Sequence, residues 1–236
     1  MRELILEKQT FTESARDYTY RMMKNNILQM CFLPGEMLSE ATAAKLLGVS
    51  RTPVHDTFAR LAQEKLVNVV TQKGTEIALI DPARVRQAVF VKGELCEEVL
   101  RRLCREGIPA DALFALESNH NQQYFMLDSG KYETIRALDT AFYARCFAVC
   151  GLTKVWQVMQ SVSYDMDRTQ ALETHTPDEW TEVIQAQTEI FNALRRHDAQ
   201  AAAVQIRDVI QQVLTRLPAL QKRYPAYFKE YPQESC

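Results

Sequence analysis

Two short helical segments separated by a tight turn constrain the fold of this chain most. Ser39 is a good N-cap for the first segment, which stops at Gly48, a residue that tolerates a left-handed backbone. Ser50 caps the second segment, which continues to about Lys65. The spacing predicts a helix-turn-helix.

The flanking residues extend this motif on both sides. An apolar stripe predicts an earlier helix over about Thr12–Gln29, capped by Thr12 or Ser14. Two β segments follow the second helix, over Val67–Thr71 and Thr75–Ile80, joined by the turn Gln72-Lys73-Gly74. Helices followed by a β-hairpin predict a winged helix-turn-helix over residues 1–80.

The rest of the chain, residues 81–236, has a helical pattern to about Phe228. Asp81-Pro82 reads as a cap and first-turn proline that open a long helix to about Arg105. Further breaks are expected at Gly107-Ile108-Pro109, Ser129-Gly130, Gly151, Thr176-Pro177 and His197-Asp198. We therefore expect a mainly α protein whose second domain is an all-α bundle of about six helices.

Charge and cysteine usage narrow the class of protein. The formal net charge is −2, and residues 1–80 carry ten basic and nine acidic side chains, so nucleic acid could be bound only by a local patch. The sequence has no signal peptide, no apolar run long enough for a membrane span and no CxxC pair among its six cysteines. A cytoplasmic protein with reduced, mostly buried thiols is expected.

The candidate DNA-binding residues gather at the start of the second helix and at the hairpin tip. A recognition helix reads base edges in the major groove with its N-terminal residues, and an arginine can donate two bonds to guanine. The hairpin tip can approach the phosphate backbone or the minor groove. The predicted residues are Ser39, Glu40, Ser50, Arg51, Thr52, His55, Lys73 and Gly74.

A longer stretch resembles the reader domain of GntR-family regulators over roughly residues 12–81. The matching pieces are the PG-x-x-L-S-E entry, the LGVSRTPV turn and helix, the RL-x-x-E-x-LV exit and the KG of the wing. The family usually has Arg-Glu after SRTPV, whereas this chain has His55-Asp56. That departure suggests a shifted operator preference.

Residues 82–220 more loosely resemble the FCD subgroup of this family, many of whose members hold a divalent metal with one Asp and three His. This chain keeps Asp139, but Tyr143, Gln187 and Val209 align with the histidines. Such side chains do not make a transition-metal site, so we expect no metal and no cofactor. The four histidines, His55, His120, His175 and His197, are expected to face solvent or cap helices.

The resemblance and the cost of burying polar groups together predict an effector site inside the bundle. Asp139 and Tyr143 share a helix face, with Gln187 opposite, and Arg168 is a candidate clamp for the carboxylate of an organic acid. The alternative is a satisfied Asp-Tyr-Gln network that only fixes packing.

The resulting hypothesis is a homodimeric transcription regulator that binds a near-palindromic operator in double-stranded DNA, with affinity modulated by a small molecule. A ligand-independent regulator with a decayed sensor is the main alternative. An enzyme is disfavoured, because no nucleophile-base motif or cofactor fingerprint accompanies Asp139 and Tyr143. Loss of DNA binding is disfavoured by Arg51, Lys73 and Gly74.

Overall fold

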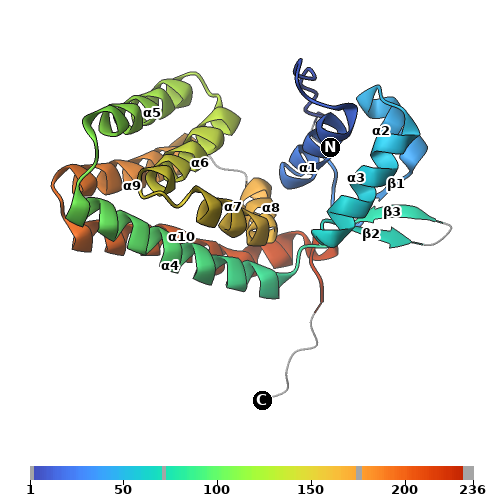
Figure 1. Ribbon diagram of the computed structural model, residues 1–236. Helices are drawn as coiled ribbons and strands as arrows, with labels where there is room; N and C mark the ends of the chain where they lie inside the picture. The colour runs from blue at the N-terminus through green and yellow to red at the C-terminus, as the bar shows by residue number, and fades with distance from the viewer. Residues whose placement is uncertain (1–2, 71–72, 174–176, 231–236) are drawn as a thin grey trace. The chain divides into compact units, whose positions relative to one another are not determined.

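A computed structural model describes residues 3–70, 73–173 and 177–230 (Figure 1). The chain divides into two compact units. Unit 1 consists of residues 1–85, 164–173 and 216–236, and unit 2 of residues 86–163 and 174–215. The mainly α class with a small antiparallel sheet is confirmed.

The helices at the start of unit 1 begin at the predicted caps. Helix α1 spans Ala15–Leu28 behind Ser14, whose hydroxyl accepts from the backbone N–H of Asp17. Helix α2 spans Glu40–Leu47, and Gly48 ends it in the left-handed conformation at φ +67°. Helix α3 spans Arg51–Gln63. The three helices share one core, which includes Met22, Leu47, Val54, Phe58 and Leu61.

A three-stranded antiparallel sheet of order β1-β3-β2 completes the winged fold. Strands β2 (Val67–Val70) and β3 (Gly74–Ile77) form the predicted hairpin, of which Thr71 and Gln72 lie outside the described residues. Strand β1 (Met37–Leu38) pairs with β3 and was not predicted, because two residues are too few to show an alternating pattern.

Unit 1 also contains segments from the second half of the sequence. Helix α8 (Tyr164–Leu172) belongs to it, and Tyr164 is part of the reader core. The end of helix α10 (Ala199–Arg223) and the 3-10 turn η1 (Pro225–Tyr227) belong to it as well. The compact units therefore differ from a division of the chain at residue 80, since the boundary is crossed four times.

The expected domain junction at Ile80 is hydrogen-bonded through both its N–H and its carbonyl to other residues of unit 1. The Ile80 N–H donates to the carbonyl of Tyr227 at 2.9 Å, and the N–H of Lys229 donates to the Ile80 carbonyl at 2.9 Å. The guanidinium of Arg168 donates to the carbonyl of Ala78 at 2.6 Å. The junction is thus a buried, hydrogen-bonded strand of chain.

Unit 2 is a helical bundle. It contains most of α4 (Pro82–Glu106) and α10, which run side by side in Figure 1, together with α5 (Ala110–Asp128), α6 (Tyr132–Val149), α7 (Thr153–Val162) and α9 (Pro177–Arg195). Helix α5 packs against both α6 and α9.

The described second half has seven α-helices where about six were expected. Helix α7 ends at Ser163 and α8 begins directly after it, although no glycine or proline lies there to predict a helix end. Helix α10 ends at Arg223, earlier than the expected Phe228. Among the described residues, no helix is long and apolar enough to span a membrane.

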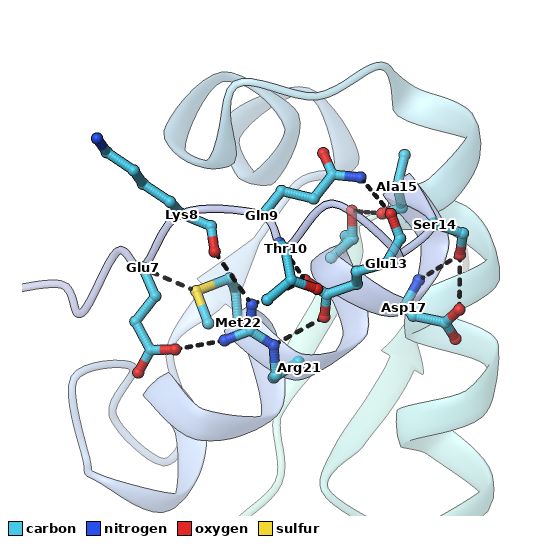
Figure 2. A network of polar contacts seen from close by, with 11 residues as sticks. Glu7, Lys8, Gln9, Thr10, Glu13, Ser14, Ala15, Asp17, Arg21 and Met22 are labelled. Carbon is cyan, nitrogen blue, oxygen red and sulfur yellow. Dashed lines mark hydrogen bonds and ion pairs between the residues drawn. The ribbon is translucent and has the colours of Figure 1, made fainter.

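The segment before α1 is fixed to that helix by polar contacts (Figure 2). The Arg21 guanidinium forms an ion pair with Glu7 and donates from Nε to Glu13 at 2.8 Å. The buried Asn26 side chain makes two hydrogen bonds of 2.8 Å with the backbone of Ile5. These contacts tie the segment before α1 to the middle and end of that helix.

Candidate DNA-binding surface and effector site

Helix α3 presents an exposed, polar N-terminal half. Arg51, Thr52 and His55 are exposed, while Val54 and Phe58 on the opposite side are buried in the core of unit 1. A guanidinium, a hydroxyl and an imidazole therefore point to solvent from one helix end, where a groove of DNA can be reached.

The two predicted serine caps behave differently. The Ser39 hydroxyl accepts from the backbone N–H of Thr42 at 3.0 Å, so it is engaged in capping α2. Ser50 occupies the N-cap position of α3, but its exposed hydroxyl makes no capping hydrogen bond. The Ser50 hydroxyl and the first N–H groups of α3 can therefore receive a phosphate.

Glu40 contacts the recognition helix itself. Its Oε1 accepts from Nδ1 of His55 at 2.8 Å, and the His55 side chain is 72% exposed. This bond, with the charge of Glu40, raises the pKa of His55. His55 is therefore biased toward its charged form, which attracts phosphate.

The wing turn exposes Lys73, and Gly74 lies beside it at φ +114°. That backbone conformation is strained for any residue with a Cβ atom, which explains a glycine at this position. The added Cβ would also lie 3.6 Å from the carbonyl oxygen of Leu38 in β1. The turn thus presents the Lys73 cation beside a backbone conformation that glycine adopts without strain.

In unit 2 the structure brings Asp139 and Gln187 together. The Gln187 amide donates to Oδ1 of Asp139 at 2.7 Å, and its own carbonyl oxygen accepts from Gln123 on α5. The Gln123 amide also donates to Asn119 at 3.0 Å. A continuous chain of side-chain hydrogen bonds therefore runs from α6 through α9 to α5.

Burial shifts the pKa of the ionisable members of this cluster. Burial raises the pKa of the Asp139 carboxyl and, together with the charge of Asp139, holds the pKa of Tyr143 well above its usual value. The Tyr143 side chain is buried and packs edge-on against Phe142. Tyr143 shares the environment of Asp139, as expected from their spacing of four residues on α6.

Sequence reasoning missed three residues of α5 at this cluster, Asn119, His120 and Gln123. We expected His120 to face solvent or cap a helix, but it is buried and bonds Thr188 at 3.1 Å. That prediction was wrong because a lone histidine on a polar helix shows no period. The spacing Asn119, His120, Gln123 on one helix was the available signal. His55 and His197 are exposed, and His175 lies outside the described residues.

Arg168 does not join the effector cluster, which corrects its predicted role as a carboxylate clamp. It lies in unit 1, is fully buried, and forms an ion pair with the equally buried Asp165. Its guanidinium also bonds the carbonyls of Ala78 and Leu79. Its Nη1 and Nη2 atoms already donate to protein groups of unit 1, although its buried Nε has no hydrogen-bond partner among the described residues.

The donor set around Asp139 does not fit a transition metal. Tyr143 and Gln187, which lie beside Asp139, offer a phenol and an amide, and these are poor ligands for such ions. Within the described ranges, no three His, Cys, Asp or Glu side chains gather as a metal site would require.

Two models of known protein families match this chain, one over the winged helix-turn-helix and one over the helical part. The model of the bacterial regulatory proteins of the gntR family matches residues 16–77, and the FCD domain model matches residues 93–212. The chain belongs to the GntR family. Its residues 3–15 precede the family match, and α8 falls inside the FCD match although it packs in unit 1.

Relatives in the GntR family cover nearly the whole chain. The transcriptional repressor RspR of Escherichia coli is 22% identical over 93% of this chain and 96% of its own. An HTH-type regulator from an unstable DNA locus of Streptomyces ambofaciens is 29% identical over 93% of this chain and 92% of its own. The solved structure of E. coli McbR/YncC shares the fold, with a TM-score of 0.75 and 18% identity over 89% of this chain and 99% of that one. This GntR-family chain is a transcription regulator and not an enzyme.

Proposed function

We propose that this regulator reads DNA with the N-terminal half of α3 in the major groove and the wing turn against the backbone. The observation that supports this is the exposure of Arg51, Thr52 and His55 beside Ser50, whose hydroxyl makes no capping hydrogen bond. Lys73 adds a phosphate contact from the wing.

We further propose a cytoplasmic homodimer that binds a near-palindromic operator. One recognition helix reads only a few base pairs, and a two-fold dimer places a second copy about one helical turn away. Selection of bound sequences from a random duplex pool tests this. An inverted repeat is expected; a single unrepeated site, with a monomer in sedimentation, would contradict the dimer.

The second part of the proposal is a small-molecule effector bound at the Asp139–Gln187 cluster of unit 2. Gln123 is fully buried, yet within the described part of the chain its Oε1 atom has no hydrogen-bond partner, and neither does Nδ1 of His120. Unpaired buried polar atoms are costly, so a ligand that satisfies them would be stabilised.

The chemistry of the cluster favours one kind of effector group. Both N–H groups of the Gln123 amide are engaged, the Gln187 amide donates to Asp139, and the unpaired Oε1 of Gln123 is an acceptor. The cluster therefore suits a hydroxyl or amino group of the effector. Arg168, the cation that motivated the expected preference for an organic acid, is instead paired with Asp165 in unit 1.

A thermal-shift screen tests the effector proposal with polyols, primary amines and mono- and dicarboxylic acids as probes, each with and without zinc. A probe that stabilises the protein and changes operator affinity is then compared on Asp139→Ala. That variant should keep its operator affinity and lose the shift, whereas Asp128→Ala, an exposed residue of α5, should keep both. A zinc-dependent shift would overturn the metal-free site.

A ligand-independent regulator is the second candidate. The continuous hydrogen bonds from Asp139 to Asn119 favour it, because they satisfy most of the cluster without any ligand. On this alternative Asp139→Ala destabilises unit 2, and no probe shifts the melting temperature of the wild type. The two candidates thus differ in the outcome of one screen.

A further inference from the structure

The exposed side of α3 carries an acid as well as the cations described above. Asp56 lies one turn after Thr52 on the same face of the helix, and its side chain is 36% exposed. A carboxylate in this position repels every DNA phosphate, so it weakens binding to DNA in general unless a donor meets it.

A cation from another helix holds this carboxylate. Arg16, in the first turn of α1, places Nη2 3.3 Å from Oδ2 of Asp56, while its side chain remains 69% exposed. Helices α1 and α3 pack in one core, and the Ser14 cap begins the turn that carries Arg16. The contacts of Arg21 tie the preceding segment to the same helix (Figure 2). The pair therefore sits at a defined place on the surface that faces DNA.

An exposed ion pair of this kind contributes little to folding. Its chemistry fits a role in reading the groove. Base edges in the major groove offer few donors, and the N4 amino group of cytosine is the one that carboxylates accept from. Arg16 has further N–H groups beyond the one that faces Asp56, and their exposure leaves them free to reach a phosphate at the edge of the groove.

We propose that Asp56 is a specificity-determining residue that accepts from a cytosine in each half-site, and that Arg16 orients it and contacts the adjacent phosphate. The inference rests on the proposed placement of α3 in the major groove. The carboxylate favours cytosine by accepting a hydrogen bond from it. It also disfavours sequences without a donor at that position, because there the carboxylate faces only acceptors.

The test repeats the random-pool selection with Asp56→Ala, Asp56→Asn and Arg16→Ala. The wild type should select cytosine at one position of each half-site, and Asp56→Ala should reduce that preference by at least roughly fivefold, the smaller end of what one mismatched pair costs. Asp56→Asn should shift the preference toward adenine, which suits an amide. Arg16→Ala should lower affinity for all sequences and reduce the salt slope by roughly 0.9 for each phosphate that the variant no longer neutralises.

A matched control is the exposed pair Glu98–Arg105 of α4, whose atoms lie 2.8 Å apart in unit 2. Alanine variants of that pair should leave base preference and salt slope unchanged. If Asp56→Ala selects the same bases as the wild type while its melting temperature is unchanged, the inference is overturned although the proposed function stands. If the wild type selects no sequence, both are overturned.

Discussion

Arg51 is the first residue of α3, and its exposed guanidinium is the side chain best placed to read a guanine. Arg51→Ala should weaken specific binding by about 1–3 kcal/mol, the usual worth of a bidentate base contact. Gel-shift titration against the selected operator measures it. Equal reductions in affinity for operator and random DNA would instead assign Arg51 to a phosphate.

His55 should make operator binding depend on pH. The bond to Glu40 is the main cause of its raised pKa, and Asp56 on the same helix raises it further by its charge. The charged ring attracts phosphate, so affinity is expected to be highest below the raised pKa and to fall as pH rises through it. Titrations between roughly pH 6 and 8.5 cover the range of histidine.

Two variants separate His55 from other titrating groups. His55→Gln should remove the fall in affinity, because a glutamine carries no charge at any of these pH values. Glu40→Gln should move the fall to lower pH, since the principal cause of the raised pKa of His55 is then removed. An unchanged pH profile in both variants would show that His55 does not touch DNA.

At the scale of elements, helix α8 comes from the second half of the sequence but packs in unit 1, which the sequence did not predict. Its Tyr164 hydroxyl accepts from Lys24 of α1, which also pairs with Glu64 at 2.8 Å. Although burial alone lowers the pKa of Lys24, these bonds raise it overall. Lys24 is therefore firmly charged, and α8 supplies one of its acceptors.

Replacing Arg168 should be strongly destabilising. Among the residues that the structure describes, Arg168→Met leaves the fully buried Asp165 with Arg84, at 3.2 Å, as its only cationic partner. Breaking a buried ion pair from one side costs about 3–5 kcal/mol, and urea unfolding of the full chain measures it. Arg105→Met, on an exposed residue, should stay within about 0.5 kcal/mol. A similarly small change for Arg168→Met would mean that Arg84 and water compensate.

The sequence predicted some elements better than others, for physical reasons. Helices α2 and α3 could be predicted because caps and Gly48 mark their ends locally. The contact of Asp139 with Gln187 followed from helix periodicity and the family resemblance. Arg168 was misplaced because periodicity shows that a residue is buried but not which partners surround it.

At the scale of the whole molecule, residues 1–85 do not contain all of unit 1. A fragment ending at Val85 would lack Tyr164, Arg168 and the C-terminal segment that bonds Ile80. Its melting temperature, followed by circular dichroism, should lie below that of the full chain. A fragment that melts like the full chain would show that these contacts add little.

The fourfold crossing between units also explains why a division at residue 80 was the natural interpretation of the sequence. Local signals change there from a β-hairpin to a long helix, and no local signal marks the return of α8. Contacts between residues more than eighty positions apart, such as Arg168 with Ala78, decide the division of the chain.

Because α8 packs in unit 1 with residues 1–85, the structure limits how genes of this kind can recombine. A crossover between two homologous genes at the codon of Ile80 would combine the Lys24 of one parent with the Tyr164 of the other. The same hybrid would pair one parent's Ala78 carbonyl with the other's Arg168. A viable hybrid must inherit the codons of α8 and of the C-terminal segment with those of the reader, so operator specificity is expected to be inherited in blocks that are discontinuous along the gene.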